Sequence, residues 1–182
     1  MKRVVFAWGR FNPPTIGHEK LLLAVKNIAG QDDFFIYPTH TQDKKKNPLD
    51  SKTKSDVMKK MFPTMNRNII YDPHIKTIIQ ALQQLQGTYH DCVLVCGSDR
   101  VQSYDKMISK YNGIEYTFRN LEVVSAGERD PDADGAEGMS ASKMRAAAVQ
   151  SDFNSFRAGM PRTISDRDCR ELMDKIRDIM LN

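Results

Sequence analysis

The sequence predicts an α/β protein with a Rossmann-like, doubly wound parallel sheet of five strands, with helices on both faces and a C-terminal helix. One pattern in the sequence predicts this fold. Short apolar runs alternate along the chain with segments whose apolar residues recur every three to four positions. Such alternation is typical of right-handed βαβ units, and parallel sheets of this kind bind ligands at the carboxyl ends of their strands.

Five apolar runs are expected to form the strands, and the fourth of them is the most pronounced. They are Arg3–Trp8, Phe34–Tyr37, Asn68–Tyr71, Cys92–Cys96 and Leu121–Ser125. Amphipathic helical patterns follow the first four runs, at 21–29, at 57–62, at 75–85 and at 101–111. Pro63 ends the second of these helices, and Gly87 closes the third. Each loop that precedes a helix can therefore lie on the ligand edge of the sheet.

The tail of the chain follows a different pattern. Ser165-Asp166-Arg167-Asp168 resembles a capping box with Asp in place of Glu, and an apolar stripe runs from Leu172 to Met180. We expect a C-terminal helix without a catalytic role. The predicted organisation is one α/β domain at 1–160 and a helix at 161–182 that packs on the same domain.

Composition limits the class of protein. The chain has 182 residues, of which 40% are hydrophobic and 27% charged, with a net charge of +4. These values suit one soluble domain that handles anions; they do not predict a nucleic-acid surface or a membrane helix. The apolar run at Arg3–Trp8 is too short for a signal peptide, so we expect a cytoplasmic protein. The sequence leaves a homo-oligomer open.

The segment from Gly9 to His18 carries the clearest chemical signal. Gly9 permits a tight turn after the first strand, and Pro13-Pro14 stiffen the loop before a helix begins near Gly17-His18. The free N–H groups at that helix start would bind an anion, and His18 and Thr15 could donate hydrogen bonds to it. The alternative is a capped helix with a solvent-facing histidine.

A second segment, Gly138-Met139-Ser140-Ala141-Ser142-Lys143-Met144-Arg145, opens another helix. Ser140 or Ser142 can cap it. Lys143 and Arg145 lie near the positive end of the helix dipole, where a cation is unfavourable unless an anion is bound. A cap followed by solvated charges explains this segment equally well when it is considered alone.

Both segments resemble signatures of the nucleotidyltransferase superfamily that includes nicotinamide-mononucleotide, nicotinate-mononucleotide and phosphopantetheine adenylyltransferases. The first signature, Gly-x-Phe-x-Pro-x-(His/Thr)-x-Gly-His, matches at Gly9, Phe11, Pro13, Thr15, Gly17 and His18. The second, Ile-Ser-Ser-Thr-x-Ile-Arg, is matched in register by Met139, Ser140, Ser142, Met144 and Arg145. Thr15 resembles the phosphopantetheine branch, whereas Gly9-Arg10-Phe11 resembles the nicotinamide-mononucleotide branch.

The resemblance implies roles for individual residues. It implies His18, Thr15 and Arg145 as the catalytic residues. The nucleotide-binding residues that it implies are Gly9, Arg10, Phe11, Asn12, Gly17, His18, Gly97, Asp99, Ser140, Ser142 and Arg145. Residues implied for the acceptor or its phosphate are Lys46, Lys54 and Arg100. Family members usually carry Arg where Lys54 stands. Lys44–Lys46 could also be a solvated loop, and Gly97–Asp99 a helix cap.

No metal site is expected in the protein itself. Asp130-Pro131-Asp132-Ala133-Asp134-Gly135 looks like a calcium loop, but Ala141 occupies the position of its bidentate Glu. We interpret this segment as an acidic, lid-like loop. The three cysteines lack zinc spacing, and His40, His74 and His90 are scattered.

The expected reaction follows from the resemblance. An acceptor phosphate would attack the α-phosphorus of ATP and release pyrophosphate, with Mg²⁺ bound through the nucleotide phosphates. A phosphate is already ionised at pH 7, so no general base is needed. The expected acceptor is nicotinamide mononucleotide, which would give NAD. The alternatives are a cytidylyltransferase acting on a phospho-alcohol or sugar phosphate and, from another class, a non-catalytic nucleotide- or nucleic-acid-binding module.

Overall fold

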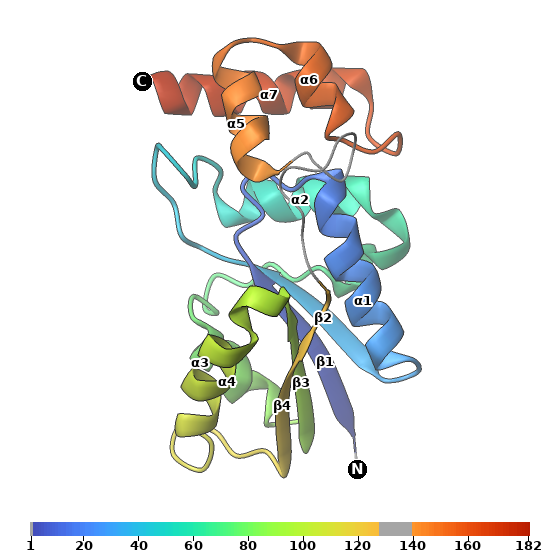
Figure 1. Ribbon diagram of the computed structural model, residues 1–182, viewed down its shortest axis with the longest axis vertical. Helices are drawn as coiled ribbons and strands as arrows, with labels where there is room; N and C mark the ends of the chain where they lie inside the picture. The colour runs from blue at the N-terminus through green and yellow to red at the C-terminus, as the bar shows by residue number, and fades with distance from the viewer. Residues whose placement is uncertain (1, 128–139) are drawn as a thin grey trace. The chain divides into compact units, whose positions relative to one another are not determined.

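The computed structural model describes residues 2–127 and 140–182 (Figure 1). These residues form two compact units, each assembled from separate stretches of the chain. The sheet unit contains residues 2–9, 20–39 and 70–127. The helical unit contains residues 10–19, 40–69 and 140–182. The predicted division at residue 160 into a domain and a packed helix stays a prediction.

The sheet unit contains a parallel sheet with strand order β2-β1-β3-β4. Its strands are β1 (Arg3–Gly9), β2 (Asp33–Pro38), β3 (Asp91–Cys96) and β4 (Asn120–Ser125). The Rossmann-like α/β class with a parallel sheet is therefore confirmed. The predicted number of strands is wrong, because the described residues form four strands and not five.

The missing strand is the run predicted at Asn68–Tyr71. The 3-10 helix η2 (Pro63–Asn68) takes the first of these residues. Ile70 N then donates one backbone hydrogen bond to Ile36 O of β2 at 2.8 Å, and the chain turns at Asp72, whose side chain accepts from His74 N. Too few residues remain between the helix and the turn for a ladder. The apolar pattern reflects burial beside an edge strand.

Helices cover the two faces of the sheet differently. Figure 1 shows α3 (Ile78–Leu85) and α4 (Val101–Lys110) on one side and α1 (Glu19–Ala29) on the other. Alternate residues of each strand face opposite sides. The strand residues that face α3 form an apolar core with this helix. They include Val4, Phe6, Cys92 and Leu94. The sheet unit is thus held by apolar burial on both faces.

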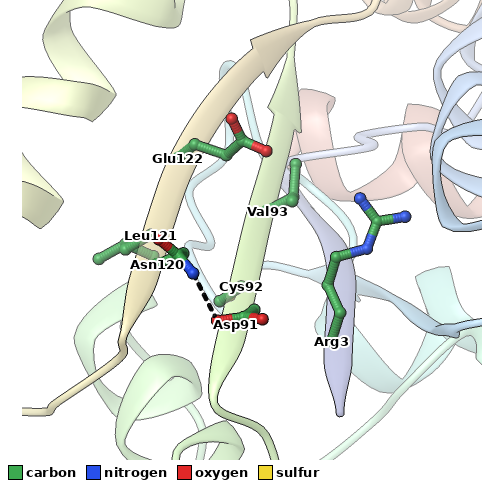
Figure 2. A pocket seen from close by; sticks show the side chains of 7 residues that line it. All are labelled: Arg3, Asp91, Cys92, Val93, Asn120, Leu121 and Glu122. Carbon is green, nitrogen blue, oxygen red and sulfur yellow. Dashed lines mark hydrogen bonds between the residues drawn. The ribbon is translucent and has the colours of Figure 1, made fainter. Parts of the chain in front are cut away.

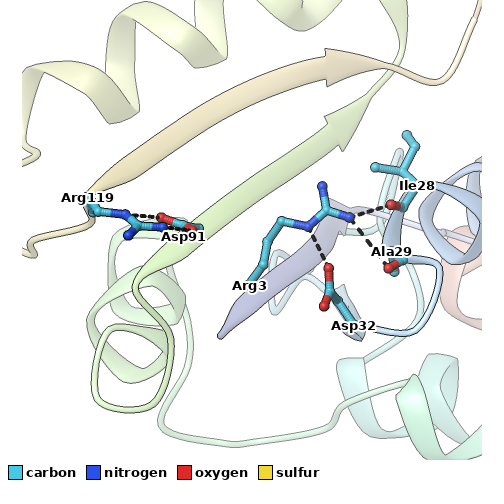
Figure 3. A network of polar contacts seen from close by, with 6 residues as sticks. All are labelled: Arg3, Ile28, Ala29, Asp32, Asp91 and Arg119. Atoms are coloured by element: carbon cyan, nitrogen blue, oxygen red, sulfur yellow. Dashed lines mark hydrogen bonds and ion pairs between the residues drawn. The ribbon is translucent and has the colours of Figure 1, made fainter. Parts of the chain in front are cut away.

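Polar contacts fix the amino ends of the strands (Figure 3). Arg3 of β1 donates to Asp32 at 2.8 Å and to the carbonyl of Ile28 at 2.6 Å, which ties the end of α1 to the sheet. Arg119 bonds Asp91 of β3 at 2.6 Å, and this pair holds the pKa of Asp91 below its usual range. Since Asp91 is exposed enough for solvent to screen it, the contact contributes little to stability.

The helical unit holds the other helices, namely α2 (Ser51–Met61), α5 (Ala141–Val149), α6 (Phe153–Ala158) and α7 (Asp166–Leu181). The C-terminal helix α7 was predicted, and Ser165 caps it by accepting from Asp168 N at 3.1 Å. Helix α7 packs on α5 and on α6 (Figure 1). The helix α6 was not predicted. No helix within residues 2–127 and 140–182 is both long and apolar enough to cross a membrane.

Candidate active site

The first signature ends in a tight turn that orients His18. Thr15 caps the 3-10 helix η1 (Ile16–His18), and its Oγ1 accepts from Gly17 N at 3.1 Å. In return Thr15 N donates to His18 Nδ1 at 2.9 Å. An imidazole whose Nδ1 accepts a hydrogen bond carries its proton on Nε2 when it is neutral. The sequence therefore folds so that Nε2 of His18 is a donor.

The backbone amides of this turn are engaged within the helical unit. His18 N donates to Thr15 O, and Ile16 N donates at 2.8 Å to the carbonyl of Gly159, between α6 and α7. Together with the bonds of Thr15 N and Gly17 N, every amide from 15 to 18 has a partner. The expectation of free N–H groups at this helix start is wrong, because a capping box and a tether to the tail use them. An anion here must be bound by side chains.

Asn12 joins the first signature to the segment before α2. It is 2% exposed. Its Oδ1 accepts from Leu49 N at 2.9 Å, and its Nδ2 donates to Leu49 O at 3.0 Å. The side chain predicted to touch a nucleotide is thus committed to backbone, and Asn12 fixes the shape of the loop.

Lys54 lies beneath the same loop. It is 0% exposed, and its Nζ donates to the carbonyl of Arg10 at 2.6 Å. Burial lowers the pKa of Lys54 to about 8, against a smaller opposing effect of Asp50. The structure thus gives Lys54 a backbone contact with the signature, which is a different contact from the predicted one with an acceptor phosphate.

The second signature contacts the first through Arg145. Ser140 caps α5 by accepting from Lys143 N at 3.3 Å, and the hydroxyls of Ser140 and Ser142 lie 3.0 Å apart. Arg145, on the first turn and a half of this helix, donates from Nη1 to the carbonyl of Asn12 at 2.8 Å. The pKa of Arg145 is lowered, mainly by burial; the charge of Asp43 opposes this shift, and the charge of Arg10 adds to it by a smaller amount.

The lysine segment forms a small ordered loop in the helical unit. Asp43 accepts from the amides of Lys45 and Lys46 at 3.0 and 2.7 Å and from the side chain of Asn47 at 2.8 Å. These bonds lower the pKa of Asp43 to about 2. Lys44 is directed to the carbonyl of Asn182 at 2.7 Å, whereas the predicted Lys46 is exposed on the loop.

The remaining predicted residues lie at the carboxyl ends of strands in the sheet unit. Gly97, Asp99 and Arg100 follow β3, where the 3-10 helix η3 (Ser98–Arg100) begins. A Cβ on Gly97 would lie 2.9 Å from Asp99 Oδ1, so the carboxylate folds back over this glycine. Their meeting with the signatures of the helical unit stays a prediction.

Lys20 is a cationic residue near the end of β4 that was not among the predicted site residues. It is the second residue after His18, and its Nζ lies 3.3 Å from the place where a Cβ of Gly127 would be. Gly127 has a φ of +104°, and it follows β4. Lys20 therefore adds a cation at the carboxyl ends of the strands. The sequence does show that this lysine lies in the first turn of a helix, close to the positive end of the dipole, where a cation is unfavourable.

The comparison with family models decides the class. The sequence model of the family described as "Cytidylyltransferase-like" matches residues 6–147, which include both signature segments. The chain belongs to the cytidylyltransferase-like family. It is accordingly a nucleotidyltransferase, and the predicted membership of that superfamily is confirmed.

Solved structures share the fold of this cytidylyltransferase-like chain at low identity. A putative nicotinate-nucleotide adenylyltransferase from Vibrio parahaemolyticus is 16% identical with a TM-score of 0.58, over 95% of this chain and 99% of that one. The Plasmodium falciparum nicotinic acid mononucleotide adenylyltransferase in complex with NaAD is 14% identical, with a TM-score of 0.59 over 96% and 98%. A bifunctional NMN adenylyltransferase/ADP ribose pyrophosphatase from Francisella tularensis is 13% identical, with a TM-score of 0.61 over 100% and 53%. The comparison with curated proteins found no significant match.

One cavity of the sheet unit lies at the amino ends of β1, β3 and β4 (Figure 2). It measures about 360 Å³, and its charged residues are Arg3, Asp91 and Glu122. Nucleotides bind at the opposite, carboxyl ends in parallel sheets. The cavity is therefore not the nucleotide site.

Two expectations lie wholly or partly outside the described residues. The acidic loop at Asp130–Gly135 and the first two residues of the second signature, Gly138 and Met139, belong to the segment 128–139. Within residues 2–127 and 140–182, no cluster of three or more His, Cys, Asp or Glu side chains could hold a metal ion.

Proposed function

We propose that this nucleotidyltransferase is an adenylyltransferase that transfers AMP from ATP to a phosphate-bearing acceptor and releases pyrophosphate. The observation that carries the proposal is the bond from Arg145 Nη1 to the carbonyl of Asn12 at 2.8 Å. It joins the two signatures, about 120 residues apart in sequence, within one compact unit. A triphosphate needs both, because one must bind the α-phosphate and the other the leaving pyrophosphate.

The chemistry assigns a task to each side chain. An acceptor phosphate oxygen attacks the α-phosphorus in line, a new O–P bond forms, and the bond between the α-phosphorus and the bridging oxygen of the β-phosphate breaks. His18 donates from Nε2 to the α-phosphate as charge develops on it. Arg145, with the hydroxyls of Thr15 and Ser142, binds the phosphates that leave. Since the acceptor is already ionised, no proton has to move, and catalysis consists of positioning and charge stabilisation.

Mg²⁺ fits this donor set when it is bound through the nucleotide. The proposed phosphate ligands are hydroxyls, an imidazole and a guanidinium, which bind phosphate oxygens and leave other phosphate oxygens for the ion. The bound ion would neutralise charge on the leaving pyrophosphate. Ser140, Ser142 and Arg145 are the residues that would hold the phosphates carrying it.

Nicotinamide mononucleotide is the proposed acceptor, which would place the enzyme in NAD synthesis. Gly9-Arg10-Phe11 supports this branch, and the structural neighbours named above are nicotinate or NMN adenylyltransferases by name. Asp99, which follows β3 in the sheet unit, is the residue proposed to accept hydrogen bonds from ribose hydroxyls.

A pyrophosphate-release assay tests the proposal. ATP and CTP should each be combined with nicotinamide mononucleotide, nicotinate mononucleotide, phosphopantetheine, flavin mononucleotide and glycerol phosphate. The expected result is release from ATP with nicotinamide mononucleotide, together with NAD in the products. Pyrophosphate release from CTP alone would show that the enzyme is a cytidylyltransferase and not an adenylyltransferase. Binding of ATP without release for any acceptor would show a module that has lost catalysis.

A further inference from the structure

Phe11 adopts a backbone conformation that its residue type disfavours. Its φ is +46°, in the left-handed region, although it has a Cβ and is only 3% exposed. Outside glycine, asparagine and aspartate, this conformation is uncommon and energetically unfavourable. It persists only where the surroundings determine it, and it tends to occur at functional sites.

Two buried side chains hold the backbone on either side of Phe11. Before it, Lys54 Nζ binds the carbonyl of Arg10 at 2.6 Å. After it, Asn12 forms its reciprocal pair with Leu49 at 2.9 and 3.0 Å. Lys54 is 0% and Asn12 is 2% exposed, so both bonds are sheltered from competing water. These contacts leave Phe11 little freedom to relax to negative φ.

The ring of Phe11 contacts His18. Their centroids are 4.9 Å apart and their planes meet at 80°, an edge-to-face arrangement. The bond from Thr15 N holds His18 Nδ1. The Phe11 ring packs edge-to-face against the imidazole and limits the tilt of its plane. The direction of the Nε2–H bond then depends on both contacts.

We propose that Phe11 is a positioning residue that aims Nε2 of His18, and that Lys54 and Asn12 act on His18 through Phe11. The proposal rests on the proposed function, because it assigns His18 the role of donor to the α-phosphate. It explains why a phenylalanine occupies a left-handed position where glycine would be unstrained: glycine has no ring to orient the imidazole. Loss of the ring should reduce kcat while leaving the KM for ATP largely unchanged.

A purely structural role for Phe11 predicts something different. A buried phenylalanine that only fills the core would lower stability when shortened, and turnover per folded molecule would be unchanged. Phe62, in the turn after α2, provides the matched control, because it is also 3% exposed and also belongs to the helical unit. Phe11→Leu and Phe62→Leu remove the same atoms from equally buried positions.

The experiment measures His18 directly and does not depend on turnover. The imidazole ¹⁵N and ¹H resonances of His18 are assigned by their absence in His18→Asn and recorded without substrate in wild type, Phe11→Leu, Phe62→Leu and Lys54→Met. Phe11→Leu and Lys54→Met should shift them, and Phe62→Leu should leave them unchanged. If the wild type transfers AMP, kcat should fall by about tenfold to a hundredfold in Phe11→Leu, the scale of a misplaced catalytic group.

Each outcome decides the proposal. Unchanged His18 resonances in folded Phe11→Leu would overturn it, as would equal shifts in Phe62→Leu. Should Phe11→Leu fail to fold, Lys54→Met still tests the transmitted effect, and unchanged resonances there would contradict it. A wild-type protein without pyrophosphate release would refute the proposed function, while the resonances would still show whether Phe11 orients His18.

Discussion

The two units are stabilised by different kinds of buried side chain. In the sheet unit the buried residues are mostly apolar, such as Phe6, Leu82 and Leu94, and Thr39 is its buried polar residue. In the helical unit the buried set also includes Asn12, Thr15 and Lys54, at 2%, 1% and 0% exposure. Burying a polar group is unfavourable unless it is hydrogen-bonded. The buried polar side chains of the helical unit are therefore held in place by specific hydrogen bonds, and they mark this unit as the location of the candidate site.

The largest expected effect is on stability and concerns the sheet unit. Leu82→Ala in α3, at a side chain that is 0% exposed, should lower the free energy of unfolding by about 2–5 kcal/mol because it leaves a cavity. Urea denaturation measures this change. Turnover per folded molecule should stay within about twofold of wild type, and a larger fall would mean that the sheet core also sets the catalytic geometry.

The next effect concerns His18 and distinguishes the roles of its two ring nitrogens. His18→Ala should reduce pyrophosphate release by about 100-fold or more, the scale of one lost oxyanion donor. His18→Asn supplies an acceptor for Thr15 N but no Nε2–H, so it should be equally inactive yet more stable than His18→Ala. Steady-state kinetics and thermal melts measure both properties, with His74→Ala as control. Near-normal turnover in either His18 variant would refute the assigned role.

Arg145→Lys should have a smaller effect, on substrate binding. A lysine can replace one charge but cannot donate to the Asn12 carbonyl and a phosphate in the same fork geometry. We expect the KM for ATP to rise by about tenfold, with a smaller change in kcat. Initial rates over a range of ATP concentrations measure this. Lys143→Ala, on the same helix, is the control, and an equal rise there would point to general charge attraction.

The smallest effect is a pH dependence from Lys54, whose pKa is lowered to about 8. The folded protein binds fewer protons than the unfolded chain between this value and the ordinary lysine pKa of about 10.4, so this group makes stability rise with pH across that window. Activity should fall by about twofold to tenfold over the same window, because a neutral amine holds the Arg10 carbonyl less strongly. A pH–rate profile and melts from pH 7 to 10 check both signs. In Lys54→Met the inflection near pH 8 should disappear. If the inflection persists in this variant, it belongs to another titratable group.

Much of the fold could be predicted from local pattern. The four strands that form, the helix after the second strand and α7 all follow from apolar spacing and caps that lie within a few residues of each other. The third predicted strand, at 68–71, does not form. An apolar run has the same composition whether it pairs in a ladder or only lies beside β2, so the sequence pattern could not distinguish the two. The helix α6 was missed because its six residues, Phe153–Ala158, are too few to show a helical period.

The sequence predicted the candidate site as a list of residues, but it did not predict the contacts between them. The first signature and Arg145 were identified because residue type and order are visible in the sequence. The bond between Asn12 and Leu49 and the burial of Lys54 depend on segments that meet only in the folded chain. The free amides expected at residues 15–18 were wrong for the same reason, since the partner of Ile16 N, Gly159, is distant in sequence.

The interleaved division of the chain has a consequence for biosynthesis. All described stretches of the sheet unit are translated before residues 140–182, so they leave the ribosome before the last stretch of the helical unit does. The helical unit cannot form until residues 140–182 follow, because Arg145 and Gly159 bind the segment made first. During that interval the nascent chain would carry a folded sheet and half of its catalytic machinery. Activity is then gained late in synthesis, in the step that brings α5 to the loop at Asn12.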